Sequence, residues 1–187
     1  MSKKYIDVIL DDDPLLRAEN ALVSIPLSAE DQQLVDSMLE YVTDSIIEEK
    51  QLEYNLKPAV GMAAPQVGVN KQIFVVRLEE YEDDDIIVEQ YALVNPKIIS
   101  HSEQMSFIKS GEGCLSVEDE YEGYVYRHAR VTIQAYDALS KKDVTLRARG
   151  FLAVAMQHEY DHLNGILFYD RIDKNEPFKV IEGAIEI

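Results

Sequence analysis

The sequence predicts an α+β fold, with largely antiparallel sheets packed around a buried C-terminal helix that carries the segment His158–His162. Strand-like segments outnumber helical ones, and they do not follow the repeated βαβ order of a parallel sheet. The chain has 187 residues, of which 47% are hydrophobic and 28% are charged, as in an ordinary globular protein. No internal repeat or linker is evident, so we expect a single domain over residues 1–187.

The first long element is an amphipathic helix from about Ser28 to Glu49. Ser28–Asp31 has the form of a capping box at its start. The apolar residues that follow recur at helical spacing: Leu34, Val35, Met38, Leu39, Val42, Ile46 and Ile47. Such a stripe is typical of a helix that packs against a core.

Two strands are predicted after Pro58, at Gln72–Leu78 and Tyr91–Ser100. The acidic stretch Glu79–Asp85 lies between them. It lacks the ligand spacing of an EF-hand, so we expect a solvated loop there.

Residues 130–148 predict a β-hairpin with one buried face, because apolar and polar residues alternate on both sides of a polar turn. The apolar positions are Val131, Ile133, Ala135, Val144, Leu146 and Ala148. After Gly150, the run Phe151–Met156 opens a helix that is apolar on nearly every side, so we expect it to be buried. Gly165 is placed to end this helix in the left-handed conformation.

The net charge of the protein limits the kinds of molecule that it is expected to bind. The formal net charge is −17 at pH 7, which disfavours binding to nucleic acid and to anionic lipid. The N-terminal residues show neither a signal peptide nor a membrane span, so we expect a cytoplasmic protein. Cys114 is the single cysteine, which excludes an intramolecular disulfide and a four-thiolate zinc site.

The segment His158–His162 reads H-E-Y-D-H within the predicted buried helix. Residues four apart share one helix face, so both imidazoles can bind one metal ion while Glu159 reaches a water molecule beside it. A buried pair of histidines without a metal is the alternative, but burial of these polar groups is costly without partners.

A catalytic metal site of this kind usually has a third protein ligand. Cys114 is the leading candidate. Spacing alone leaves two alternatives open, namely a buried cysteine without chemistry and a cysteine nucleophile paired with histidine.

Three segments together resemble the signature motifs of peptide deformylases, in the same order. They are AVGMAAPQ (Ala59–Gln66), EGCLS (Glu112–Ser116) and QHEYDH (Gln157–His162). The likeness extends from Leu16 to about Asp170, and the long segment between the first two motifs is similar to the type 2 enzymes of bacteria.

The resemblance implies that Cys114, His158 and His162 bind one divalent metal ion and that Glu159 handles protons. It also implies that Fe²⁺ is the physiological ion, with Ni²⁺, Co²⁺ or Zn²⁺ as alternatives in purified protein. The implied reaction removes the formyl group from the formyl-methionine of newly synthesised polypeptides.

Further roles follow from the same resemblance. The Gln66 side-chain amide and the Leu115 backbone N–H would stabilise the oxyanion of the reaction. The backbones of Val60, Gly61 and Gly113 would pair with the extended substrate.

The implied partners are N-formylmethionyl nascent peptides and a transient ribosome contact, with no direct nucleic-acid specificity and no membrane. Ala59 departs from the glycine that usually opens the family's first motif, and we expect this methyl group to affect fine substrate preference. His101 and His128 lie outside the motifs and receive no role.

Two other functions compete with this interpretation. H-E-x-x-H also occurs in zinc endopeptidases, but the further histidine or glutamate of those families is missing here. A non-catalytic peptide-binding protein with a structural metal is the second alternative, and Glu159 argues against it because a closed structural site needs no proton carrier.

Overall fold

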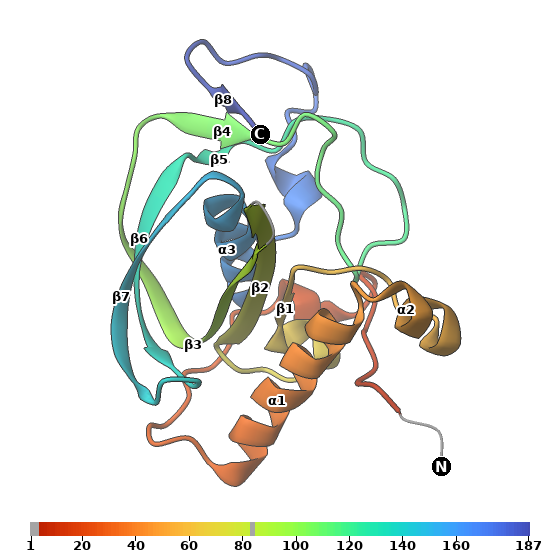
Figure 1. Cartoon of the computed structure of the whole chain (residues 1–187). Helices are drawn as coiled ribbons and strands as arrows, with labels where there is room; N and C mark the ends of the chain where they lie inside the picture. The colour runs from red at the N-terminus through yellow and green to blue at the C-terminus, as the bar shows by residue number, and fades with distance from the viewer. Residues whose placement is uncertain (1–3, 83–84) are drawn as a thin grey trace.

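A five-stranded antiparallel sheet in the order β1-β2-β3-β6-β7 forms the larger part of the protein (Figure 1). The computed structural model describes residues 4–82 and 85–187. The strands of this sheet are β1 (Gly61–Ala63), β2 (Ile73–Glu82), β3 (Asp85–His101), β6 (Arg130–Asp137) and β7 (Lys142–Arg149). The two ends of the sheet are β1 and β7, so each of these strands has one unpaired edge within the sheet.

Within the described residues, a second, smaller sheet and three α-helices complete the fold. The order in the smaller sheet is β5-β4-β8, with β4 antiparallel to β5 and parallel to β8. Its strands are β4 (Met105–Phe107), β5 (Arg127–His128) and β8 (Ile185–Glu186). The helices are α1 (Ala29–Asp44), α2 (Glu48–Tyr54) and α3 (Gly150–Leu163), with 3₁₀ helices η1 (Pro14–Arg17), η2 (Ala64–Val67) and η3 (Phe168–Arg171). The predicted α+β class with largely antiparallel strands is confirmed.

Strand β1, residues 73–76 of β2 and residues 92–94 of β3 are buried, because α1 and α3 cover opposite sides of this part of the sheet. Ile73 and Val75 pack in the core cluster that contains α1, whereas Phe74 and Val76 pack in the cluster that contains α3. All four side chains are 0% exposed. One apolar layer therefore lies between the sheet and α1, and a second lies between the sheet and α3. The second layer places β1 beside α3.

Helix α3 is buried along most of its length, as its sequence predicts. It ends in a Schellman motif, in which the Gly165 N–H donates to His162 O (3.3 Å) and the Ile166 N–H donates to Asp161 O (3.0 Å). Gly165 has φ +70°, and a Cβ there would lie 2.5 Å from the carbonyl oxygen of Arg17. The predicted left-handed end is thus confirmed. In the part of the chain that the structure describes, every helix is too short or too polar to cross a lipid bilayer.

The prediction of one helix from Ser28 to Glu49 is wrong at its C-terminal end. The Ser28 hydroxyl caps the helix as expected by accepting from the Asp31 N–H (3.1 Å), but α1 stops at Asp44. The buried Ser45 hydroxyl instead bonds the backbone of Val42 (3.0 Å) and accepts from the Ala59 N–H (3.1 Å). The bond with Ala59 ties the end of the helix to the chain just before β1.

The prediction of a solvated loop over residues 79–85 is also wrong for most of its length. Strand β2 continues to Glu82 and β3 begins at Asp85, with Glu79 paired to Val88 and Glu82 to Asp85. Asp83 and Asp84, which belong to the predicted loop, lie outside the described residues. Cross-strand pairing thus extends the hairpin into a sequence that local composition marks as a loop.

The predicted hairpin over residues 130–148 is confirmed as β6 and β7. Val131, Ile133 and Ala148 are 2%, 0% and 3% exposed, and they belong to the core cluster that contains α3. The outer face of the same hairpin carries polar and charged side chains. On that face Arg130 lies opposite Arg149 in the register.

The N-terminal segment ties distant parts of the chain together. The Ile9 N–H donates to Gln66 O (2.8 Å), and the Asn20 N–H donates to Leu163 O (3.1 Å). The Asn20 side-chain amide also donates to His162 O (3.4 Å). This segment therefore holds both η2 and the C-terminal end of α3.

Candidate metal centre

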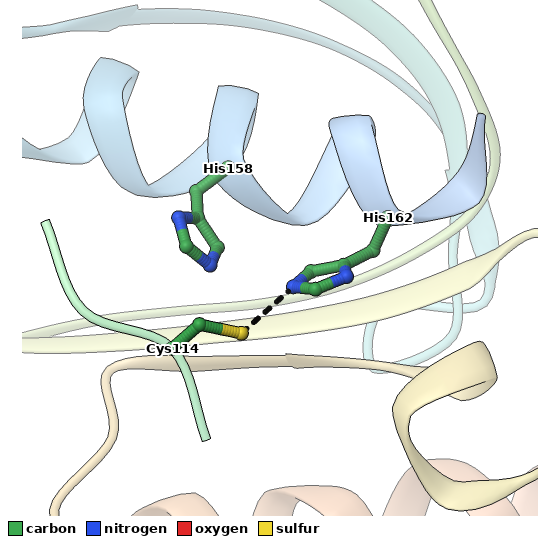
Figure 2. A group of neighbouring side chains, drawn as sticks. All are labelled: Cys114, His158 and His162. Carbon is green, nitrogen blue, oxygen red and sulfur yellow. Dashed lines mark hydrogen bonds between the residues drawn. The ribbon is translucent and has the colours of Figure 1, made fainter. Parts of the chain in front are cut away.

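Cys114, His158 and His162 lie together, with both rings on the side of α3 that faces the loop of Cys114 (Figure 2). One ligand atom from each residue lies within 4.8 Å of the other two. Cys114 Sγ is 3.3 Å from His162 Nε2, and the two ring centroids are 5.1 Å apart. The expected convergence of the two histidines and the cysteine is present.

This cluster fits a metal ion in both geometry and donor chemistry. Metal–sulfur and metal–nitrogen bonds of about 2.3 and 2.1 Å in a tetrahedral site place sulfur and nitrogen about 3.6 Å apart. The observed 3.3 Å between Cys114 Sγ and His162 Nε2 is close to that value. One thiolate and two imidazoles form a donor set that suits zinc, iron or nickel.

A chain of buried charged groups orients His158. Its Nδ1 donates to Glu112 Oε2 (2.9 Å), which leaves Nε2 available to a metal. Arg127 donates to both oxygens of Glu112 (2.6 and 2.8 Å) and to Asp161 Oδ2 (2.8 Å). Arg171 completes the chain with two bonds to Asp161 (2.5 and 2.6 Å). The side chain of Arg127 is 1% exposed, and each buried charge in this network of side chains has an opposite charge beside it.

The two histidines of the cluster lie in different electrostatic environments. Burial alone raises the pKa of Glu112, but hydrogen bonds with His158 and Arg127 reverse this and lower the pKa to about 2. Burial lowers the pKa of His158, whereas Cys114 and Glu112 raise it, for a net pKa of about 10. Burial and the neighbouring His158 lower the pKa of His162 well below its ordinary value. Cys114 and Glu112 thus favour a positive charge at His158, whereas His162 is held neutral, which is the form of imidazole that binds a metal ion.

Glu159 lies beside the cluster with an unusual protonation equilibrium. The residue is 4% exposed, and its Oε2 has no hydrogen-bond partner among the described residues. Burial raises the pKa of Glu159 to about 7, against the opposing effect of the positive charges of His158 and Arg127. A carboxyl group with this pKa can accept and release a proton near neutral pH. Gly61 of β1 lies directly against it, since a Cβ at that position would be 2.4 Å from Glu159 Oε1.

Gln66 and Leu115 present donors near Cys114. The Ala63 N–H donates to Gln66 Oε1 (2.8 Å), which turns the amide nitrogen toward Cys114 Sγ (3.4 Å) and Ser116 Oγ (3.4 Å). The backbone N–H of Leu115 has no acceptor among the described residues. It is therefore free to donate to a ligand in the cleft.

A cleft of about 510 Å³ opens beside the cluster and is lined on one side by Ala59, Val60 and Gly61 and on the other by Gly111 to Leu115. The cleft is also lined by apolar residues for which the sequence predicted no role in a site: Ile46, Pro58, Ile108, Val117, Phe151, Val154 and Ala155. Because β1 is an edge strand, its outer edge can pair with an extended peptide. Gly113 has open space around it, with no atom within 4 Å of an added Cβ.

Part of the orienting network was missed from sequence. Glu112 and Asp161 stand inside the EGCLS and QHEYDH segments, which gave the available signal. Arg127 and Arg171 carry no local pattern that separates them from surface charges, and only the fold brings them to Asp161.

An antiparallel α+β fold with a Cys/His/His cluster, a buried carboxyl group and a peptide-sized cleft beside a strand edge defines a metal-dependent hydrolase acting on peptides. The profile of the family described as polypeptide deformylase matches residues 6–178. The chain belongs to the polypeptide deformylase family, whose members hydrolyse the N-terminal formyl group of newly made polypeptides in a metal-dependent reaction.

Relatives and solved structures agree with this membership. The chain is 46% identical to a peptide deformylase of Macrococcus caseolyticus over 97% of both chains. It is 45% identical to peptide deformylase 2 of Geobacillus stearothermophilus over 97% of this chain and 96% of the relative. A class I type b peptide deformylase of Acinetobacter baumannii, solved with Met-Ala-Ser bound, has a TM-score of 0.70 and 34% identity over 90% of this chain and 99% of that one.

Proposed function

We propose that this chain acts as a single catalytic domain over residues 1–187, and that Cys114, His158 and His162 hold the one metal ion with which it deformylates formyl-methionyl polypeptides. The observation that carries the proposal is the convergence of these three ligand atoms within 4.8 Å beside a buried carboxyl group whose pKa is about 7. Fe²⁺ is the ion we expect physiologically, with Ni²⁺, Co²⁺ or Zn²⁺ as substitutes in purified protein. When bound, the ion acidifies water and polarises the formyl carbonyl group.

Glu159 is the proton carrier in this proposal. Its carboxylate takes a proton from the attacking water and delivers it to the nitrogen of the leaving amine. Burial supports this role, because it raises the pKa of Glu159 to about 7 and so makes both protonation states accessible. Contact with Gly61 keeps the carboxyl group in place.

Gln66 and Leu115 stabilise the negative charge that develops on the formyl oxygen. The fixed side-chain amide of Gln66 and the free backbone N–H of Leu115 both lie next to Cys114. Two such donors, already oriented before the reaction, contribute a large part of the rate enhancement in acyl transfer.

The substrate lies between the edge of β1 and the segment that contains Cys114. The backbones of Val60 and Gly61 pair with it on one side, and the backbone of Gly113 approaches it from the other. Apolar residues of the cleft receive the methionine side chain. Ala59 contacts the same cleft, and its methyl group affects substrate preference. The substrate is a nascent polypeptide in the cytoplasm, and the enzyme reaches it through a transient contact with the ribosome.

The test is deformylation of formyl-Met-Ala-Ser by protein prepared anaerobically, with metal content quantified. Acetyl-Met-Ala-Ser serves as the matched substrate. Exclusion of one methyl group from a shaped site is worth roughly 1–3 kcal/mol, or about 10–200-fold in kcat/KM, and the weaker electrophilicity of acetyl adds to it. Equal rates on the two peptides would indicate a broader amidase, and cleavage of internal bonds would indicate an endopeptidase.

A further inference from the structure

Three arginines share the outer face of the β6–β7 hairpin. The hairpin itself lies at the left of Figure 1. Arg130 of β6 lies opposite Arg149 of β7, and Thr132 lies opposite Arg147 in the same register. All three arginines are exposed. Like charges directly opposite each other on a sheet repel, so an anion bound between them would be stabilising.

These arginines differ from all others in the chain. Every other arginine forms an ion pair with a carboxylate: Arg17, Arg77, Arg127 and Arg171. By contrast, the guanidinium groups of Arg130, Arg147 and Arg149 have neither an ion pair nor a hydrogen bond within the described residues, and Arg130 is bonded there only through its backbone. The chain holds 35 acidic and 18 basic residues, so a shortage of carboxylates does not explain three unpaired arginines at one place.

A hollow of about 540 Å³ lies beside them, lined also by Ser100, His101, Ser102, Val131, Thr132 and Ala148. None of the lining residues, all of which the structure describes, is acidic. The exposed ring of His101 stacks on His128, with centroids 3.7 Å apart and planes 20° apart. The hollow therefore combines unpaired cations, hydroxyl groups and a supported aromatic ring.

We propose that this arginine face, defined by Arg130, Arg147, Arg149 and His101, binds single-stranded RNA without sequence specificity. Arginines contact phosphates of the backbone, and a base stacks on the free side of the His101 ring. A lipid surface fits less well, because the apolar lining residues Val131 and Ala148 are buried. A second copy of the chain fits less well too, since it would bring another −17 charges into contact.

The overall negative charge does not prevent such binding. At physiological ionic strength the Debye length is about 8 Å, so the local charge of a face outweighs charges on the far side of the molecule. Contacts to phosphates position a protein on RNA but carry no sequence information. The expected interaction is thus weak, sensitive to salt and independent of the catalytic residues.

Binding of metal-loaded protein to a short single-stranded RNA of mixed sequence tests the proposal. The variant R130Q/R147Q removes two phosphate contacts, and K174Q/K179Q, which neutralises two exposed lysines elsewhere, is the charge-matched control. Loss of two contacts lowers the salt dependence of binding by about 1.4 units of log K against log salt. The native protein and the control should therefore lose about sevenfold more affinity than R130Q/R147Q between about 50 and 200 mM salt.

His101→Ala separates RNA from other polyanions. It should weaken RNA binding about fivefold or more, through loss of stacking, and leave binding of inorganic polyphosphate unchanged. Deformylation of formyl-Met-Ala-Ser by every variant should equal that of the native protein, which reports correct folding separately. The proposal is overturned if the native protein does not bind RNA at low salt, or if R130Q/R147Q and the control lose the same affinity for RNA between the two salt concentrations. It is also overturned if the native protein binds polyaspartate as tightly as RNA, or if the protein self-associates through this face.

Discussion

Replacement of Gly61 by alanine tests how closely the position of Glu159 controls the reaction. The added Cβ would lie 2.4 Å from Glu159 Oε1 and 2.8 Å from both Cδ and Cγ. The carboxyl group must move by about 1 Å to reach an ordinary contact distance of 3.4 Å. Glu159 is buried in α3, so this shift takes it out of line with the metal and the substrate. Misplacement by 1 Å costs on the order of 10²-fold, and we expect kcat to fall by about that factor.

The assay is steady-state deformylation of formyl-Met-Ala-Ser, with metal content measured in the same samples. Gly113→Ala is the matched control, because nothing lies within 4 Å of its added Cβ. We expect this control to keep a kcat close to native and to change KM alone, since its methyl group would face the peptide. A Gly61→Ala enzyme with full metal content and nearly native kcat would refute the reasoning.

Three further predictions concern the metal and the proton. Glu159→Gln should retain the metal and lose about 10²–10⁴-fold in kcat, as measured on metal-replete protein; near-native turnover would remove Glu159 from the mechanism. Glu112→Gln should weaken metal affinity about 10–100-fold in a competition assay with a chelator, because His158 loses its charged partner, and unchanged affinity would contradict this role. Iron-loaded protein should lose activity in peroxide faster than nickel- or zinc-loaded protein, and equal decay rates would count against iron bound to Cys114.

Local patterns predicted the elements whose stability depends on burial of one face. The hairpin β6–β7 and the buried α3 follow from apolar spacing alone, and the cap at Ser28 follows from its residue type. The end of α1 depends instead on Ser45, whose hydroxyl bonds the backbone of Ala59 fourteen positions away. No local pattern contains that information, so the sequence predicted a longer helix.

The candidate site also contains residues that local patterns predict and residues that only the fold brings together. The spacing of His158 and His162 on one helix predicts their convergence, which the structure confirms. Cys114 lies 48 residues from His162 in the sequence, and spacing could not choose between a ligand and a nucleophile there. Arg127 belongs to no recognisable pattern, because its role depends on two carboxylates, Glu112 and Asp161, that two other segments of the chain bring to it.

The hydrogen bond between Asn20 and the end of α3 can form only late in the synthesis of the protein. Asn20 is synthesised 142 residues before His162, whose carbonyl group it binds. At about 5–20 residues per second, that interval lasts roughly 7–30 s. During it the Asn20 side-chain amide lacks this acceptor, and the second histidine of the candidate metal centre has not yet been added to the chain. The three candidate ligands Cys114, His158 and His162 are therefore complete only after most of the chain has been made, so a metal ion held by all three can bind only late in synthesis.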